Sequence, residues 1–319
     1  MSETPPVTRR LDEARSLISA FAGDGLKTDA ALDSYTSFRI GGPADLLLEP
    51  SSPQVLARAL EQADRLDIPV TMLGGGTNVL VADSGVRGLV VRLGKAFNYT
   101  RWGQEDEAGA VVVEAGAAVR LARLVRESVQ RGLGGLEFAA GIPGSVGGGT
   151  LMNAGAFGGE IGDAIGAVQV CTRGGEIVDM DRSSLPFSYR KLALGADVMI
   201  ISVRFRLLRS PLGRLKAVVE RVQAKRKTKQ PGGLPNAGSV FKNPHGEFAG
   251  RLIERAGLKG LSVGDAQVSP EHANFIVNLG GARAREVRDL MSLVQEAVWL
   301  KCGVWLEPEV RLIGAWDET

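Results

Sequence analysis

Glycine is concentrated in two short stretches of this 319-residue chain, and they constrain its fold more than any other feature of the sequence. The first is the run Gly74–Asn78 (GGGTN), which follows a short apolar segment, Val70–Leu73. The second is the segment 134–162, which holds eleven glycines in 29 residues. Apolar residues such as Ile142 and Val146 continue through it, so it is expected to be packed rather than a flexible linker. Only glycine allows a backbone to approach a flat ligand closely over so many positions.

Consecutive glycines after a strand let backbone N–H groups converge, and such concavities hold phosphate oxygens. The run Gly74–Asn78 could act in this way, with Thr77 and Asn78 adding side-chain hydrogen bonds, or it could be a tight structural turn. No GK[ST] follows at the spacing of a P-loop, and the chain contains no GxGxxG, so both ordinary nucleotide fingerprints are missing. Two such loops on neighbouring β-rich segments would suit a large cofactor that contains a diphosphate.

Composition and charge exclude several classes of protein. The chain has 38 basic and 36 acidic residues, a net charge of +2, whereas nucleic-acid binders normally carry a strongly basic face. No apolar run approaches the ~18 residues of a membrane-spanning helix, and the first residues lack the apolar core of a signal peptide. Cys171 and Cys302 cannot form a disulfide framework, and two histidines argue against a multi-histidine metal site. We therefore expect a cytoplasmic protein without nucleic-acid, membrane or metal partners.

Hydrophobic periodicity and turn residues predict a mixture of helices and strands. Helices are expected at 53–66, 121–129, 213–229, 247–256 and 284–300. Strands are expected at 70–73, 89–93, 110–115, 168–172, 176–180, 197–208, 275–279 and 304–313. Ser52 and Pro53 are typical of a helix N-cap and first turn, Gly174-Gly175 of a hairpin, and residues 1–15 of a loose leader. Near Ser210-Pro211 the expected glycine-rich β structure gives way to alternating helices and strands, which predicts a domain boundary.

Seven segments of the chain, in order, carry distinctive motifs. They are YTSFRIGGPAD (35–45), LGGGTNVLVADSGVRGLVV (73–91), FAAGIPGSVGGGTLMNAGAFGGEI (138–161), SYR (188–190), QPGGLPNAGSVFKNP (230–244), SPEHANFIVN (269–278) and LEPEVRLIG (306–314). Together they resemble the UDP-N-acetylenolpyruvoylglucosamine reductase family of flavoenzymes, which complete UDP-N-acetylmuramate in bacterial peptidoglycan synthesis. The resemblance covers nearly the whole chain from Tyr35 onward. Agreement of that extent and order is not expected by chance.

The resemblance implies an α+β fold, in which a two-lobed FAD-binding domain of the p-cresol methylhydroxylase type is followed by a smaller α/β substrate-binding domain. We accordingly expect the first FAD-binding lobe, with its leader, at 1–93, the second lobe at 94–210 and the substrate-binding domain at 211–319. The family uses NADPH to reduce FAD and then reduces UDP-N-acetylglucosamine enolpyruvate. A flavin oxidase of the same fold and a sensor that binds FAD without turnover are the alternatives.

The resemblance also implies the binding partners. FAD is expected to be non-covalent, because the first glycine loop offers no His or Cys of the kind that related oxidases use for attachment. NADPH is the co-substrate, a nucleotide sugar is the substrate, and the protein is expected to be a monomer. The chain is short and resembles the subtype that lacks a tyrosine-bearing loop over the substrate.

Three residues match the catalytic positions of the family. Arg190 would stabilise the enolate-like charge that follows hydride addition, Ser239 would donate the proton, and Glu309 would order or recharge that donor. From the sequence position alone, Arg190 could be a surface residue at a strand end, Ser239 a turn residue and Glu309 an ion-pair partner of a neighbouring arginine.

The remaining site residues also come from the resemblance. The substrate-binding candidates are Lys242 and Asn243. The cofactor-binding candidates are Tyr35, Leu73, Gly74, Gly75, Gly76, Thr77, Asn78, Val79, Leu80, Ala140, Gly141, Ile142, Pro143, Gly144, Ser145, Gly147, Gly148, Asn153, Gly155 and Ala156. A side chain at Gly75 or Gly147 is expected to exclude FAD. His272 is expected to be a hydrogen-bonded structural residue, and the basic run 225–229 to be a solvated helix end or a diphosphate-steering site.

Overall fold

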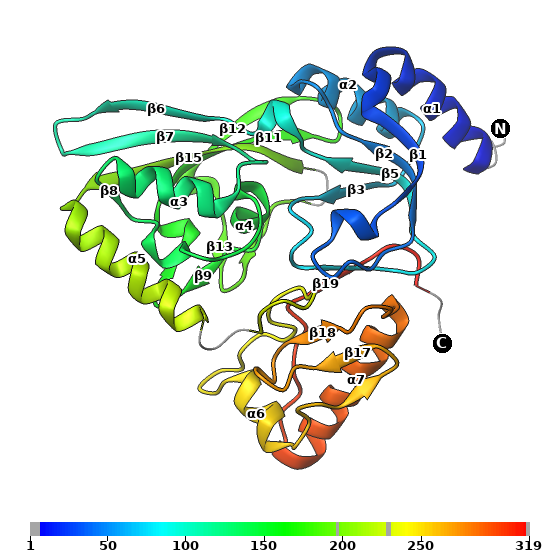
Figure 1. Cartoon of the computed structure of the whole chain (residues 1–319). Helices are drawn as coiled ribbons and strands as arrows, with labels where there is room; N and C mark the ends of the chain where they lie inside the picture. Colours follow the sequence, from blue (N-terminus) through cyan, green and yellow to red (C-terminus); the bar gives the residue numbers. More distant parts are fainter. Residues whose placement is uncertain (1–6, 196–197, 228–230, 317–319) are drawn as a thin grey trace. The chain divides into compact units, whose positions relative to one another are not determined.

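The structure is a computed structural model that describes residues 7–195, 198–227 and 231–316 (Figure 1). These residues form two compact units, and the chain passes repeatedly between them. Unit 1 holds the described residues of 1–28, 46–75 and 88–224, and unit 2 those of 29–45, 76–87 and 225–319.

Unit 1 contains most of the regular structure. Its helices are α1 (Val7–Ala22), α2 (Pro53–Arg65), α3 (Leu121–Gln130), α4 (Val146–Leu151) and nearly all of α5 (Leu212–Lys227). Its strands are β3 (Val70–Leu73), β6 (Thr100–Glu105), β7 (Ala110–Gly116), β8 (Leu133–Gly134), β9 (Gly155–Ala156), β10 (Gly159–Glu160), β11 (Ile165–Thr172), β12 (Ile177–Asp181), β13 (Phe187–Ser188), β14 (Lys191–Leu192) and β15 (Val198–Arg209). In β1 (Leu26–Ala31), β2 (Pro43–Leu48) and β5 (Val86–Arg92) the chain passes from one unit to the other, and a four-stranded sheet has the order β1-β2-β5-β3.

The larger sheet of unit 1 is antiparallel, with the order β12-β11-β15-β7-β6, and β8 also pairs with β15. Its central strand β15 is buried along most of its length. Val203 and Phe205 of β15 pack in one hydrophobic core with Leu124 of α3 and Val146 of α4. Figure 1 shows this sheet in teal and green, with α3, α4 and the yellow-green α5 beside it.

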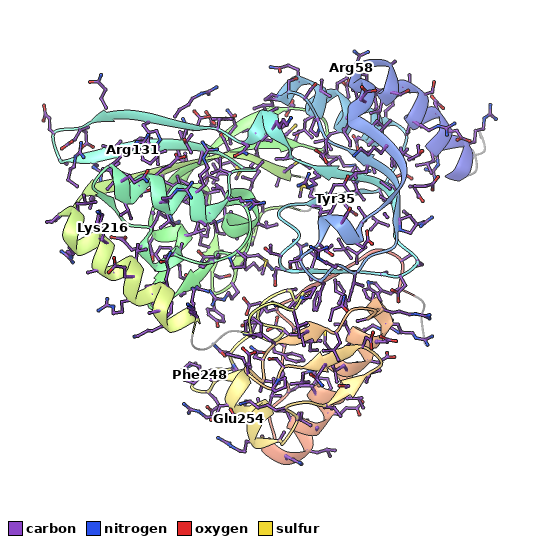
Figure 2. The ribbon with its side chains drawn as sticks, in the orientation of Figure 1. Tyr35, Arg58, Arg131, Lys216, Phe248 and Glu254 are labelled. Atoms are coloured by element: carbon purple, nitrogen blue, oxygen red, sulfur yellow. The ribbon has the colours of Figure 1, made fainter. Side chains whose placement is uncertain are left out.

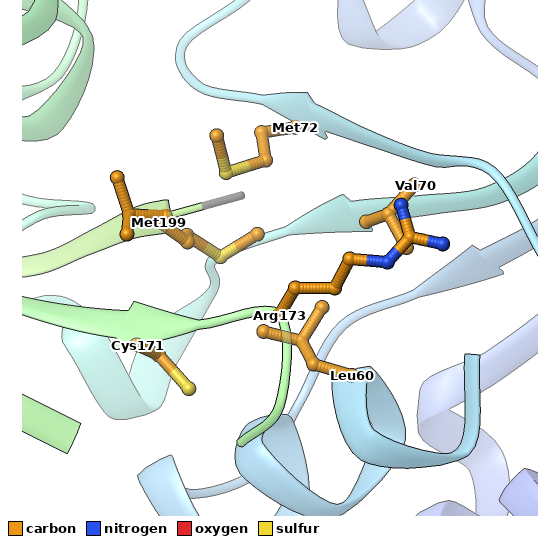
Figure 3. A pocket seen from close by; sticks show the side chains of 7 residues that line it. Leu60, Val70, Met72, Cys171, Arg173 and Met199 are labelled. Carbon is orange, nitrogen blue, oxygen red and sulfur yellow. The ribbon is translucent and has the colours of Figure 1, made fainter. Parts of the chain in front are cut away.

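A second core of unit 1 joins the helices α1 and α2 to the smaller sheet and to the end of the larger one. Cys171, near the end of β11, belongs to it and is fully buried. Figure 3 shows its thiol near a small pocket that is lined by residues of α2, β3, β11 and β15, among them Leu60, Met72 and Met199.

Most helices and strands confirm the sequence predictions. Ser52 caps α2, since its hydroxyl accepts a hydrogen bond from the N–H of Val55 at 3.2 Å, and Pro53 begins the helix. Strands β11 and β12 form the predicted hairpin around Gly174-Gly175. The expected end of the basic helix at residues 228 and 229, and the expected start of β15 at residue 197, lie outside the described residues.

The expectation of a loose leader at 1–15 is wrong from residue 7 onward, where α1 begins. The helix packs through Ala14 and Ile18, which are fully buried, and Arg10 forms an ion pair with Asp67 at 2.8 Å. Only a narrow stripe of this helix is buried, which is why its sequence looks polar. The helix is held in place by packing against the rest of unit 1.

Unit 2 contains the antiparallel sheet β16 (Ser262–Val263), β17 (Ala266–Val268) and β18 (Ile276–Asn278), with α6 (Ala249–Arg255) and α7 (Ala284–Cys302). A separate parallel pair joins β4 (Val79–Val81) to β19 (Arg311–Ile313). One hydrophobic core fills the unit. The prediction of a single strand over 304–313 is wrong, because only 311–313 is regular strand. Pro308 has no N–H to donate to a ladder, and it makes only an isolated bridge to Phe241 within the described residues.

None of the described helices combines the length and the apolar character needed to cross a membrane.

Candidate active site

The structure brings the two glycine-rich segments together in unit 1. A methyl group built on Gly75 would lie 3.0 Å from Cα of Gly144 and 3.2 Å from the nitrogen of Ser145. One on Gly74 would lie 3.3 Å from Oγ of Ser145. The two loops therefore approach each other closely, a contact that the sequence did not indicate, and glycine is needed for it.

Ser145 starts the helix α4 beside this contact. Its hydroxyl accepts a hydrogen bond from the N–H of Gly148 at 3.3 Å, and the N–H of Gly147 donates to the carbonyl of Ala117 at 2.9 Å. The two glycines that follow Val146 face different surroundings. A methyl on Gly147 would lie 2.8 Å from Cβ of Ala117, whereas one on Gly148 would meet, among the described residues, only Oγ of Ser145 at 3.4 Å. Gly147 is thus required by packing, and the main chain at Gly148 is half-exposed.

The chain passes from unit 1 to unit 2 inside the first glycine run, between Gly75 and Gly76. Gly76 has a φ of +65°, and a methyl there would lie 1.9 Å from the carbonyl oxygen of Tyr35, so no other residue fits. The N–H of Ser37 donates to the carbonyl of Gly76 at 2.9 Å. Tyr35, labelled in Figure 2, is the last residue of a short 3-10 helix, η2 (Asp33–Tyr35), and is half-buried. Within unit 2, the second half of the glycine run is therefore fixed against residues 35–37.

Several cofactor-binding candidates have side chains that are already used in packing. Leu73, Leu80 and Ala140 are buried in the cores of their units, so only their main-chain groups are available to a cofactor. Asn153 is 1% exposed, and its amide group makes three hydrogen bonds to the protein, which are described below.

Arg190 lies in the two-residue turn between β13 and β14, where Ser188 pairs with Lys191. Its φ is +57°, a left-handed conformation that is uncommon outside glycine and clusters at functional sites. The guanidinium carbon lies 5.2 Å from the centre of the Tyr189 ring, and the residue is half-buried. The turn therefore fixes the backbone of the predicted catalytic cation.

Unit 2 brings the main chain of Glu309 beside that of Val240, the residue after Ser239, although 69 residues separate Ser239 from Glu309 in the sequence. The N–H of Glu309 donates to the carbonyl of Val240 at 2.7 Å, which places the carboxylate residue beside the main chain that follows Ser239. The amide of Asn78 donates to the carbonyl of Glu309 at 3.0 Å, and the carbonyl of Asn78 accepts from the N–H of Arg311 at 3.0 Å. Asn78 therefore anchors the Glu309 segment as well as belonging to the first glycine loop.

Asn274 holds the Ser239 segment and was not singled out by the sequence reasoning. Its side chain accepts from the N–H of Phe241 at 3.0 Å and donates to the carbonyl of Phe241 at 2.8 Å. Its own carbonyl accepts from the N–H of Val240 at 2.9 Å. The only sequence signal was its place within SPEHANFIVN. His272 accepts from the N–H of Asn274 at 3.1 Å, which confirms it as a hydrogen-bonded structural residue.

The two substrate-binding candidates each have a protein partner. Lys242 forms an ion pair with Glu307, whose side chain is 70% exposed. Oδ1 of Asn243 accepts from the N–H of Ala249 at 3.1 Å, at the start of α6. A phosphate group could exchange with the exposed Glu307 carboxylate, since exposed ion pairs are weak.

The sequence and the structure both match known proteins. Residues 230–313 match the family model described as UDP-N-acetylenolpyruvoylglucosamine reductase, C-terminal domain, and residues 44–181 match one described as FAD binding domain. The reductase of that name from Agathobacter rectalis is 45% identical over 297 residues, which is 91% of this chain and 94% of the relative. The one from Rubrobacter xylanophilus is 46% identical over 290 residues, 90% of this chain and 95% of the relative. The crystal structure of the enzyme from Thermus caldophilus superposes with a TM-score of 0.78 at 39% identity, covering 90% of this chain and 99% of that one.

Proposed function

The chain belongs to the UDP-N-acetylenolpyruvoylglucosamine reductase family, and we propose that Arg190, Ser239 and Glu309 perform the chemistry of that reductase in it. Its fold is α+β, with an FAD-binding domain of the p-cresol methylhydroxylase type and a following reductase domain. It is an NADPH-dependent flavoprotein that reduces UDP-N-acetylglucosamine enolpyruvate to UDP-N-acetylmuramate in peptidoglycan precursor synthesis. FAD, when bound, supplies the hydride transfer between NADPH and the substrate.

Arg190 is the group suited to the negative charge of the reaction. Addition of a hydride to the β-carbon of the enolpyruvyl group leaves negative charge on the α-carbon and its carboxylate. A guanidinium stays protonated at any working pH and can pair with a carboxylate through two parallel hydrogen bonds. The left-handed turn supports this role, because it fixes the base of a long side chain that would otherwise be free to move.

Ser239 is the proposed proton donor to the α-carbon, and Glu309 the group that orders or recharges it. The observation that carries this assignment is the hydrogen bond of 2.7 Å from the N–H of Glu309 to the carbonyl of Val240. It fixes the main chain of Glu309, from a distant part of the sequence, against the residue that follows Ser239. Both residues are half-buried, so a carboxylate here can act on a neighbouring hydroxyl or on a shared water.

The domain boundaries, oligomeric state and location are part of the same proposal. The divisions at 93 and 210 are supported by three hydrophobic cores, because each predicted domain supplies most residues of one core. We propose a cytoplasmic monomer of 33.7 kDa with non-covalent FAD, which light scattering and acid release of the flavin would test. The cofactor-binding residues named from the resemblance belong to this proposal, apart from Asn153, whose buried amide is used inside the protein; main-chain contacts are expected at those whose side chains are buried.

Anaerobic stopped-flow absorbance of Ser239→Ala tests the catalytic assignment. Reduction of the flavin by NADPH needs no proton from Ser239, so its rate should equal that of the parent. Reoxidation by the enolpyruvyl substrate should fall ~10²–10⁴-fold, the usual effect of removing a general acid. Ser239→Cys should retain part of this activity, and Ser262→Ala, at an exposed serine of β16 in the same unit, is the matched control. Reoxidation of Ser239→Ala at the parent rate would remove Ser239 as the donor.

A further inference from the structure

Three residues other than glycine have left-handed backbone conformations in the part of unit 1 that surrounds Arg190. Their φ values are +40° at Asn153, +53° at Phe157 and +57° at Arg190. Phe157 lies in the tight turn between β9 and β10, and Asn153 lies just before β9. Such conformations persist only where the surroundings hold them, so the contacts that hold them indicate what is being positioned.

The side-chain amide of Asn153 joins its own segment to residues 160–162 and to Ser188. Its nitrogen donates to Oε2 of Glu160 at 2.6 Å and to the carbonyl of Ser188 at 2.9 Å. Its oxygen accepts from the N–H of Gly162 at 3.1 Å. The residue is 1% exposed. Both hydrogens of the amide are therefore used inside the protein, and an aspartate could not replace it, because a carboxylate has no hydrogen to donate to the carboxylate of Glu160.

The Ser188 carbonyl is the point at which this network reaches the catalytic turn. Ser188 pairs with Lys191 across the turn that contains Arg190, so fixing its carbonyl fixes the base of the turn. The same amide nitrogen also donates to Glu160, which belongs to β10.

Gly155 provides the space in which the guanidinium lies. A methyl on Gly155 would lie 3.1 Å from Nη1 of Arg190, 2.9 Å from Cγ of Glu160 and 2.8 Å from the carbonyl of Gly159. The side chains of Arg190 and Glu160 therefore both pass over the same glycine. The guanidinium of Arg190 therefore lies near the Gly155 backbone and near Glu160, whose carboxylate accepts a hydrogen bond from Asn153.

We propose that Asn153 is the positioning residue for Arg190. Its amide fixes the Ser188 carbonyl and the Glu160 carboxylate at once, so that the guanidinium is held over Gly155 before the substrate arrives. This assigns Asn153 to the alignment of the catalytic cation rather than to contact with FAD. The inference rests on the proposed role of Arg190.

A double-mutant cycle between Asn153→Ala and Arg190→Ala tests the proposal, with both half-reactions followed by anaerobic stopped-flow absorbance. Asn153→Ala should bind FAD and be reduced by NADPH at the parent rate, while the substrate step slows ~10–100-fold, since a misplacement of about 1 Å can cost that much. The loss should appear in kcat more than in KM. In the Arg190→Ala background, Asn153→Ala should have no further effect, because a residue that acts through another adds nothing once the other is gone.

The outcomes separate this inference from the proposed function. If Arg190→Ala alone leaves the substrate step unchanged, the proposed function of Arg190 fails. If Arg190→Ala is slow but Asn153→Ala slows both backgrounds equally, or selectively loses FAD, the positioning role is refuted. Should Asn153→Ala not fold, Asn153→Gly takes its place in the cycle, because glycine adopts the φ of +40° without strain and also removes the amide.

Discussion

Replacing Gly147 and Gly148 by alanine should separate packing of the second glycine loop from cofactor binding by it. A methyl on Gly147 would lie 2.8 Å from Cβ of Ala117, whereas carbon atoms prefer about 3.5–4.0 Å, so α4 must move by roughly 1 Å. Overpacking of this kind costs about 1–3 kcal/mol, and alanine returns at most about 1 kcal/mol in helix propensity. The structure thus changes the sequence expectation for Gly147, whose replacement acts on the fold itself and not only on FAD.

The expected net loss for Gly147→Ala is about 1–2 kcal/mol, which lowers the melting temperature by about 2–8 °C for a unit of this size. Gly148→Ala should leave the apoprotein as stable as the parent, because its methyl makes an ordinary contact of 3.4 Å with Oγ of Ser145. It should nevertheless lose flavin, since the methyl would occupy the surface proposed for the FAD diphosphate.

Thermal unfolding of the flavin-free proteins, together with flavin content after reconstitution, measures both effects. Gly213→Ala in α5 is the control for propensity alone, because a methyl there has no described atom within 4 Å. Parent-like stability of Gly147→Ala apoprotein would refute the packing argument. Full flavin loading of Gly148→Ala would refute the proposed cofactor surface.

Two further predictions concern buried groups. Asn274→Ala should lower the free energy of unfolding by about 1–3 kcal/mol for each main-chain group of Phe241 that is left unpaired. It should also slow the substrate step, because the Ser239 segment is held less firmly. A free energy of unfolding equal to that of the parent, measured with urea, would contradict this. Burial raises the pKa of the Cys171 thiol from 9.0 to about 11. Between these pH values the thiol stays protonated in the folded state but loses its proton in the unfolded state. The contribution of this group to stability is therefore lost as the pH rises through that interval. Urea unfolding from pH 8 to 11 should therefore show a decline in the parent that is smaller in Cys171→Ala, and equal declines would count against it.

Local signals predicted the local structure well. The N-cap at Ser52, the first-turn Pro53 and the hairpin glycines Gly174-Gly175 each act within a few residues, so the sequence is enough to place α2 and the β11–β12 hairpin. The errors arose where contacts with distant residues determine the local structure. Helix α1 depends on packing of Ala14 and Ile18 against other segments, and the predicted strand at 304–313 is shortened by the missing N–H of Pro308.

The candidate site shows the same limit. Its glycine loops were visible as composition, yet nothing local indicated that Gly147 faces Ala117 while Gly148 is open. Ser239 and Glu309 are separated by 69 residues, and only the resemblance to a family connected them in the sequence; the structure links Glu309 to Val240, the residue after Ser239. Asn274 and the role of Asn153 were missed because their hydrogen bonds to Phe241 and Ser188 join residues 33 and 35 positions apart, and such bonds leave no periodic pattern in a single sequence.

Anaerobic titration of the purified protein tests the central claim most directly. The account predicts a bound flavin whose absorbance is bleached by NADPH and restored by UDP-N-acetylglucosamine enolpyruvate, with one UDP-N-acetylmuramate formed per flavin reoxidised. A protein that binds no flavin, or whose reduced flavin persists with this substrate and is reoxidised by oxygen alone, would contradict it.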